Sequence, residues 1–184
     1  MDIFVGDLVR LTQIDREDLP TFVKWFQDYE VKRFLGTGVH PYTVENEKDW
    51  LDCVLTETDA YHFSIRTLEE DRLIGNCGLF GFDWRNRLAE FGIVIGEKDA
   101  WGRGFGTDSA RIIQRFAFGE LNLNRLWLRV FSFNPRGQRS YEKAGFLHEG
   151  TMRAALYREG AYHDVHVMSV LQSEWRMHND ASGN

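Results

Sequence analysis

The chain has 184 residues, of which 43% are hydrophobic and 27% charged, and its 22 basic and 28 acidic side chains give a formal net charge of −6. This length suits one domain with a substantial core, and 14% aromatic content with only three prolines argues against a disordered chain. An acidic average disfavours nucleic-acid binding, because phosphates need a basic face. No apolar run approaches the roughly 18 to 20 residues of a membrane span, and the start lacks a secretory signal. We therefore expect a cytoplasmic protein with neither a nucleic-acid nor a membrane partner.

Two cysteines, Cys53 and Cys77, can pair only once and lack the spacing of metal ligands. A disulfide scaffold and a zinc ribbon are therefore poor interpretations. We expect both thiols to be small buried side chains, and we expect no metal cofactor.

The first third of the chain predicts one strand and two helices. Residues 7–13 alternate as a short strand would, and apolar residues recur at helical spacing from Leu19 to Phe26, with Pro20 in the first turn. Thr43 is a suitable cap for a second helix that extends to about Leu55.

The middle of the chain is rich in aromatic and β-branched residues. Segments 61–67, 73–82 and 89–95 are separated by polar residues, which predicts three antiparallel strands joined by hairpin loops. Glycines follow, and then an amphipathic pattern that predicts a helix ending near Gly119.

The last third predicts a strand, a helix and a hairpin. Residues 125–131 alternate, Asn134 and Pro135 form a strong helix start, and Gly145 is a matching stop. Strands at 147–156 and 164–171 flank a turn at Glu159-Gly160. The order βααβββαβαββ predicts a single α/β (α+β) domain over residues 1–178, with a mixed, mostly antiparallel sheet flanked by helices and a disordered tail at 179–184.

The segment IVIGEKDAWGRGFGTDSA carries the clearest chemical signal. Closely spaced glycines let successive backbone amides converge, and a helix N-terminus adds partial positive charge, so the turn predicts a site for a pyrophosphate. The chain has no GxxxxGK[ST] motif, which argues against a P-loop nucleotide. A dinucleotide fold would place this turn after the first strand of a βαβ unit and an acidic residue on the next strand, and residues 125–131 contain no acid.

The turn WGRGFG and the later segment FNPRGQRSYEKAGFLHEG together resemble the Gcn5-related N-acetyltransferases, the GNAT family. The resemblance extends from about Asp7 to Trp175 and is strongest to the branch of ribosomal-protein N-terminal and spermidine acetyltransferases. Trp101 departs from the family motif, which has Arg or Gln at this position. The resemblance implies a GNAT-like fold and acetyl-CoA as the acyl-donating cosubstrate.

The resemblance also implies which residues contact the cofactor. The pantetheine arm would pair with the fourth strand, and the glycine turn would bind the pyrophosphate, with further contacts from the helix that Asn134 begins. The expected cofactor residues are Ile93, Val94, Ile95, Gly102, Arg103, Gly104, Phe105, Gly106, Thr107, Asn134, Arg136, Ser140 and Lys143.

Acetyl transfer to an amine requires that the ammonium lose a proton and that the leaving thiolate be protonated or stabilised. Tyr141 matches the family's tyrosine acid, and Glu90 is the candidate base. His163, Asp164 and His166 are alternative bases. A cysteine nucleophile would need an organised base, which the sequence does not reveal, so direct attack in a ternary complex is preferred.

The acceptor remains open at this level: a polyamine, an aminoglycoside, an amino sugar or a peptide N-terminus. The resemblance assigns the acceptor side to the first two helices and to loops that include Trp25, Tyr29, Phe34, His40 and residues 82–87, where Asp28, Glu30 and Asp83 would suit a cation. A non-catalytic acyl-CoA-binding or regulatory module and an acyltransferase with another donor are the alternative functions. The terminal hairpin could pair two copies as a homodimer.

Overall fold

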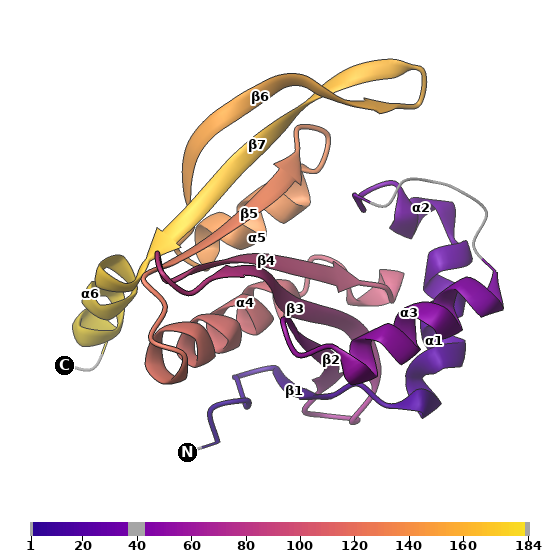
Figure 1. The fold of residues 1–184 in the computed structure, drawn as a ribbon, viewed down its shortest axis with the longest axis horizontal. Coiled ribbons are helices and arrows are strands. Elements are labelled where there is room, and N and C mark those ends of the chain that lie inside the picture. Colours follow the sequence, from indigo (N-terminus) through magenta and orange to yellow (C-terminus); the bar gives the residue numbers. More distant parts are fainter. Residues whose placement is uncertain (1, 37–42, 183–184) are drawn as a thin grey trace.

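The computed structural model describes residues 2–36 and 43–182, with side chains to Met177. Its centre is one seven-stranded sheet in the order β1-β2-β3-β4-β5-β7-β6 (Figure 1). Neighbouring strands are antiparallel except β4 and β5, which are parallel. The predicted mixed, mostly antiparallel sheet is therefore confirmed. The strands are β1 Val9–Gln13, β2 Tyr61–Thr67, β3 Leu73–Asp83, β4 Leu88–Ile95, β5 Arg125–Phe131, β6 Leu147–Arg158 and β7 Ala161–Leu171.

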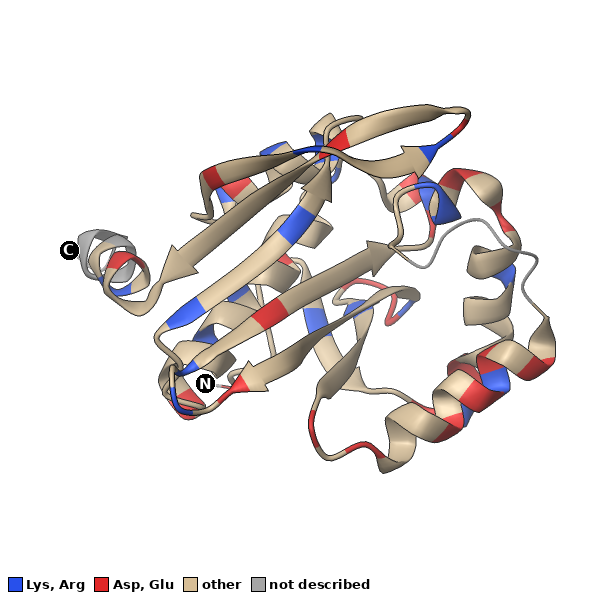
Figure 2. Cartoon of the chain, turned by 45° about the horizontal axis from the view of Figure 1, so that its top comes forward, with Lys and Arg blue, Asp and Glu red and all other residues tan. Residues whose placement is uncertain are grey.

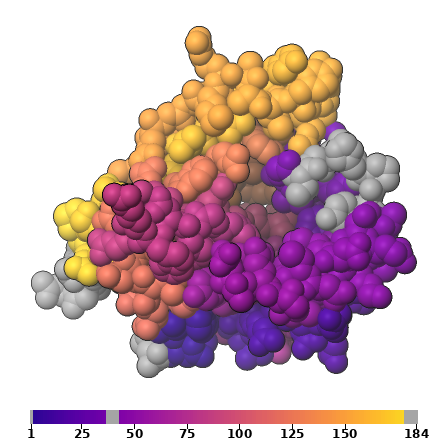
Figure 3. All heavy atoms as spheres, in the orientation of Figure 1, coloured from indigo at the N-terminus to yellow at the C-terminus, as the bar shows by residue number. Residues whose placement is uncertain are grey.

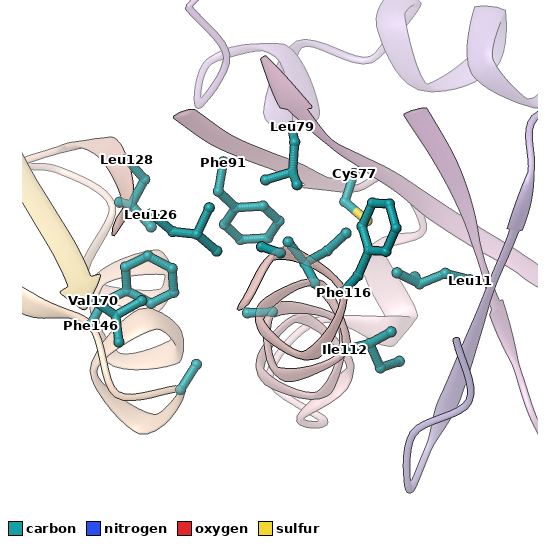
Figure 4. Close-up of a cluster of buried hydrophobic side chains, with 14 of the residues drawn as sticks. Leu11, Cys77, Leu79, Phe91, Ile112, Phe116, Leu126, Leu128, Phe146 and Val170 are labelled. Atoms are coloured by element: carbon teal, nitrogen blue, oxygen red, sulfur yellow. The ribbon is translucent and has the colours of Figure 1, made fainter. Parts of the chain in front are cut away.

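Helices cover both faces of the sheet. One face packs against α4 and α5, and α1 to α3 lie on the other, as Figures 1 and 4 show. The helices are α1 Leu19–Gln27, α2 Tyr29–Lys32, α3 Val44–Thr56, α4 Phe105–Arg115, α5 Pro135–Lys143 and α6 Gln172–Ser182. No helix in the described part of the chain is long and apolar enough to cross a bilayer.

Local sequence signals account for most of the element ends. The Thr43 hydroxyl accepts a hydrogen bond from the Asn46 amide at 3.1 Å, and the Asn134 side chain accepts one from the Gly137 amide at 3.0 Å. Each satisfies an amide that the first helical turn leaves free. The turn between β6 and β7 falls at Glu159 and Gly160, which both have positive φ (54° and 79°), as the favoured two-residue hairpin turn requires.

The helices differ from the prediction at α2, at the end of α4 and at α6. A four-residue helix, α2, follows α1 after Asp28, whose side chain caps it by accepting from the Glu30 amide. The helix expected to run to Gly119 is α-helical only to Arg115 and continues as a wider π-helical turn over Phe116–Glu120. The helix α6 directly follows β7, with the Glu174 carboxylate accepting from the Leu171 amide at 2.8 Å.

The core is divided by the sheet into two clusters. The larger lies on the α4 and α5 face, where the buried side chains Leu79, Phe91, Ile112, Leu126 and Phe146 converge in Figure 4. The smaller lies between α1, α3 and the opposite face, around Phe22, Trp25 and Leu51. Burial of each large apolar side chain stabilises the fold by about 1.5 to 3 kcal/mol before entropy is counted, so the two clusters hold the helices rigidly against the sheet.

Candidate active site

The strands β4 and β5 are joined over only part of their length. Their parallel pairing covers Leu88, Ala89 and Glu90 of β4, opposite Arg125 to Trp127 of β5. Beyond Glu90 the strands diverge, and in the described part of the chain the edge of β4 that faces β5 has no strand partner from Phe91 to Ile95. An open strand edge offers backbone amides and carbonyls to a ligand.

A cavity of about 990 Å³ occupies this divergence. Its lining comes from both faces of the sheet: Glu90 and Arg129 on the α1 to α3 side, and Arg111, Ser140 and Lys143 from α4 and α5 on the other. Figure 3 shows one opening as the hollow between the β6–β7 region and the helices α2 and α3. The cavity therefore passes through the sheet, so two molecules can approach one point from opposite faces.

The glycine turn lies at one end of this cavity. Gly102 and Gly104 adopt positive φ (75° and 92°), a conformation that favours glycine. Gly104 is also the N-cap residue of α4, and because it has no side chain it cannot accept a hydrogen bond from the first amides of the helix. A Cβ at Gly106 would lie 3.3 Å from the Ser140 hydroxyl oxygen. The first amides of α4 therefore have no side-chain cap, which is the arrangement that the predicted anion site requires.

Trp101, the residue that departs from the family motif, holds the turn in place. Its indole Nε1 donates to the Ile95 carbonyl at 2.7 Å, which joins the turn to the end of β4. The Arg136 guanidinium carbon lies 3.7 Å from the centre of its ring, a cation–π stack that fixes an arginine from α5 beside the turn. Burial lowers the pKa of Arg136, yet a guanidinium remains charged at any working pH. Arg136 therefore places a positive charge beside Trp101, the position that departs from the motif.

Hydrogen bonds hold α5 against α4. The Thr107 hydroxyl lies 3.0 Å from that of Ser140, and Arg111 donates to the Lys143 carbonyl at 3.0 Å. The Gln114 amide donates to the Ala144 carbonyl at 2.7 Å. These contacts fix the distance between the glycine turn and the side chains of α5.

The cations around the turn have no acidic partner among the described residues. Most other arginines form ion pairs or bind carbonyls, but Arg136, Arg139 and Lys143 do neither, although all three line the cavity. Arg103 is also unpaired, but it packs on the Phe105 ring (5.2 Å) outside the cavity lining. We call the turn, with Arg111, Arg136, Arg139 and Lys143, the glycine end. In a chain of net charge −6, unpaired cations gathered at one site fit a polyanion.

Tyr141 lies between the two ends of the cavity. Its ring packs edge-on against Phe91 and Phe146, at 6.4 and 6.0 Å between ring centres. Burial raises the pKa of its phenol to about 12, so the hydroxyl remains protonated at neutral pH. No described residue accepts a hydrogen bond from it, and Tyr141 lines the cavity, so its proton is available to a bound molecule.

Glu90 and Arg129 form an ion pair at the opposite end. Arg129 donates through Nε and Nη2 to the two carboxylate oxygens of Glu90, at 2.9 and 3.3 Å. Glu90 is the last residue of β4 that pairs with β5, so its carboxylate lies where the strands separate. We call this region, with the neighbouring Phe131, Met152, Leu156 and Val165, the ion-pair end.

The other candidate bases and nucleophiles are used elsewhere. Asp164 accepts from the Ala154 amide at 2.8 Å, the His163 ring lies 3.1 Å from the Arg158 carbonyl oxygen, and His166 lies 2.9 Å from the Thr151 hydroxyl. None of the three lines the cavity. Cys77 is buried, as expected, and burial raises the pKa of its thiol, whereas Cys53 is exposed on α3, contrary to expectation. Cys53 is exposed because it lies outside the apolar stripe that α3 buries.

Only some of the acceptor-side residues expected from the resemblance lie at the cavity. Phe34 lines the cavity, whereas Trp25 is core and the loop 82–87 does not reach the cavity. His40 lies outside the described residues. The three acids expected to attract a cation all have partners: Asp28 and Glu30 bind Lys98 at 2.8 and 2.6 Å, and Asp83 accepts from the Asn86 side chain at 2.7 Å.

Several cavity residues had no signal in the sequence. They are Arg111, Arg129, Arg139, Met152, Leu156 and Val165. Arg129 lies two residues after Trp127 and therefore on the same face of β5, but its partnership with Glu90 depends on the register of two parallel strands joined by a crossover. Such a register is set by tertiary packing and leaves no local pattern.

Comparison with known proteins identifies the family. Residues 9–147 match the family model described as an acetyltransferase (GNAT) domain. The chain belongs to the GNAT acetyltransferases. Enzymes of this family transfer an acetyl group to an amine and use acetyl-CoA as the donor, and this chain is accordingly an N-acetyltransferase.

Relatives of this GNAT chain support the same conclusion. It is 28% identical over 179 residues to the uncharacterized N-acetyltransferase p20 of Bacillus licheniformis, covering 95% of this chain and 99% of that one. It is 33% identical over 106 residues to spermidine N(1)-acetyltransferase of Vibrio cholerae, covering 58% and 61% of the two chains. The crystal structure of the V. cholerae spermidine N-acetyltransferase with CoA and spermine has the same fold, with a TM-score of 0.83 at 24% identity over 91% of this chain and 98% of that one.

Proposed function

We propose that this acetyltransferase moves the acetyl group of acetyl-CoA directly to a primary amine, with both substrates bound at once. The observation that carries the proposal is a cavity that crosses the sheet, with an anion-binding end on one face, an ion pair on the other and a tyrosine hydroxyl between them. Acetyl-CoA supplies the activated acetyl thioester. No cysteine is among the described residues that line the cavity. We therefore propose that the amine attacks the thioester itself and that no acyl-enzyme forms.

The cofactor would be held by the glycine end and by the open edge of β4. The free amides of the turn Gly102–Thr107 would bind the pyrophosphate, with charge from Arg136 and Lys143. Backbone groups of Ile93 to Ile95 would pair with the amide-bearing arm, and an amide of this edge would donate to the developing oxyanion. The side chains of Asn134 and Ser140 position α5 for these contacts.

Two residues would move protons. Glu90 would take the proton from the acceptor ammonium, either directly or through water, which frees the lone pair of the nitrogen for attack on the thioester carbon. As the carbon–sulfur bond breaks, Tyr141 would donate its hydrogen bond or proton to the sulfur. Its raised pKa suits this role, because an acid must hold its proton until the thiolate forms.

Two assays on the purified chain test the proposal: titration calorimetry with acetyl-CoA, and thiol release from acetyl-CoA with a panel of amines. We expect binding of acetyl-CoA and release of thiol that depends on the amine, with Glu90→Gln reducing the rate at saturating cofactor. Binding without turnover on any amine would instead support the non-catalytic module, and a faster reaction with succinyl-CoA would support another donor. Absence of binding would contradict the assignment of the glycine end.

The cytoplasmic location and the homodimer remain predictions. The outer edge of β6 has no strand partner in the described part of the chain, and Leu147, Met152 and Tyr157 on this strand are exposed. Such an edge can pair with a second copy, which sedimentation velocity measures directly.

A further inference from the structure

The charges at the ion-pair end are balanced before any acceptor binds. Among the described residues that line the cavity, the acids are Asp7, Glu90 and Asp108. Asp7 and Asp108 lie near the glycine turn, and Asp108 accepts three backbone hydrogen bonds, from Asp7, Leu8 and Val9, at 2.8 to 3.1 Å. Glu90 is therefore the one acid among them at the ion-pair end, and it is already bound by Arg129.

An apolar wall lies next to this pair. Arg129 and Phe131 alternate along β5 with the buried Leu128 and Val130, so they share the opposite face of the sheet. Val165 lies beside Phe131 in the β5–β7 ladder, and Met152 lies beside Val165 in the β7–β6 ladder. Phe131, Val165 and Met152 therefore continue the Arg129 face, and all three line the cavity with Leu156.

An acceptor that uses Glu90 as its base must separate Glu90 from Arg129. An ammonium group that takes the place of Arg129 at the carboxylate leaves the guanidinium without an anion. When Glu90 then accepts the proton, both Glu90 and the amine become neutral and Arg129 holds the only remaining charge. A simple amine or a peptide N-terminus leaves this charge uncompensated, and a polyamine adds further positive charge beside it. An acceptor that brings its own carboxylate keeps the site balanced at each step.

We propose that the acceptor is a zwitterion, a free α-amino acid or close analogue with an apolar side chain. Its ammonium group binds Glu90, its carboxylate takes the two guanidinium donors of Arg129, and its side chain lies on the wall formed by Phe131, Met152, Leu156 and Val165. The Arg129 side chain is 53% exposed, which leaves it room to move aside and admit the molecule between the two charges. This inference rests on the proposed function, because it assigns the acceptor of the same reaction.

The test compares acceptors that differ in one charge. Thiol release is measured at saturating acetyl-CoA with leucine, leucinamide, a leucine-initiated tripeptide amide and spermidine. Leucinamide keeps the amine and the side chain but replaces the carboxylate with a neutral amide. Its amine is also less basic, so more of it is free to react, and the comparison is biased against the proposal. We expect kcat/KM for leucine to exceed that for leucinamide by at least about 10-fold.

The matched variants are Arg129→Gln and, as the control, Arg85→Gln, an exposed arginine of the β3–β4 loop outside the cavity lining. Arg129→Gln should raise KM for leucine by roughly 10- to 100-fold and should therefore lower kcat/KM for leucine far more than kcat/KM for leucinamide. Arg85→Gln should change neither. Equal or faster turnover of leucinamide, the tripeptide amide or spermidine would overturn the zwitterion proposal while leaving the N-acetyltransferase function intact. Tight acetyl-CoA binding with no turnover on any of the four would also overturn the zwitterion proposal, whereas the proposed function fails only if the wider amine panel is not acetylated either.

Discussion

The two ends of the cavity handle charge in opposite ways. At the glycine end, Arg136, Arg139 and Lys143 have no acidic partner among the described residues, and the first amides of α4 are free. At the ion-pair end, Glu90 and Arg129 already neutralise each other. The chain as a whole is acidic, with a net charge of −6, and Figure 2 shows acidic residues at several places along α3. The unpaired cations are therefore a local feature of the glycine end.

This difference indicates how each substrate gains its binding energy. A polyanion at the glycine end acquires partners that the protein lacks, so attraction is available without breaking an existing contact. An acceptor at the ion-pair end must exchange one contact for another, so its net gain depends on how well it replaces both charges. The first end therefore favours affinity, and the second favours discrimination between amines.

The largest effect should come from the residue between the two ends. Tyr141→Phe removes the phenol proton and keeps the ring that packs against Phe91 and Phe146. If Tyr141 is the acid, kcat should fall by roughly 10- to 10⁴-fold, with little change in the Kd for acetyl-CoA. Steady-state kinetics and calorimetry on the same preparation measure the two quantities. An unchanged rate would show that the leaving thiolate needs no proton from this residue.

Glu47 on α3 is a buried acid, in contrast to the paired Glu90 of the ion-pair end. Its side chain is fully buried, and neither carboxylate oxygen has a hydrogen-bond partner in the described part of the chain. Burial raises the pKa of this carboxyl from 4.5 to about 7. Because the pKa is higher in the folded than in the unfolded chain, the folded state is favoured below pH 4.5 and loses this stability as the pH rises to about 7.

Glu47→Gln removes this titration and should therefore stabilise the fold at high pH. We compare the free energy of unfolding of the variant with that of the wild type at pH 4.5 and at pH 8. Between these pH values the variant should gain about 3 kcal/mol relative to the wild type, because one pKa unit corresponds to about 1.4 kcal/mol. Urea denaturation at the two pH values measures the shift. Glu45→Gln, an exposed acid on the same turn, is the control and should show almost none. A pH-independent difference at Glu47 would mean that the carboxyl finds a partner in solution.

Local signals account for most of the fold and for one end of the site. Asn134, Gly145 and the Glu159-Gly160 turn each act on their immediate neighbours, so the sequence predicts their structure directly. The glycine turn is equally local. The two glycines with positive φ and the helix that follows occupy adjacent positions in the chain, so the turn itself was identified without the fold, whereas Arg111 and Arg139 of the same end were not.

The ion-pair end could not be predicted in the same way. Glu90 and Arg129 are separated by a helix and meet only because three residue pairs of β4 and β5 set the register. Met152 and Val165 reach the cavity because β7 inserts between β5 and β6, which no local pattern encodes. The stack of Arg136 on Trp101 has the same origin, since it joins a turn to a helix that is distant in sequence.

Arg136→Ala should give the smallest effect, and it tests whether this stacked arginine serves the phosphates. The guanidinium has no acidic partner among the described residues, so its loss should remove a charge-assisted contact to the cofactor without leaving a buried anion behind. We expect the Kd for acetyl-CoA to rise by roughly 10-fold, the scale of one such contact, and the Kd for acetyl-pantetheine, which has no phosphate, to stay unchanged. Arg85→Ala, which removes the same charge outside the cavity lining, should alter neither value. An equal loss for both ligands would instead mean that Arg136 only supports the position of Trp101, and the glycine end would then bind the cofactor through its amides and the remaining cations.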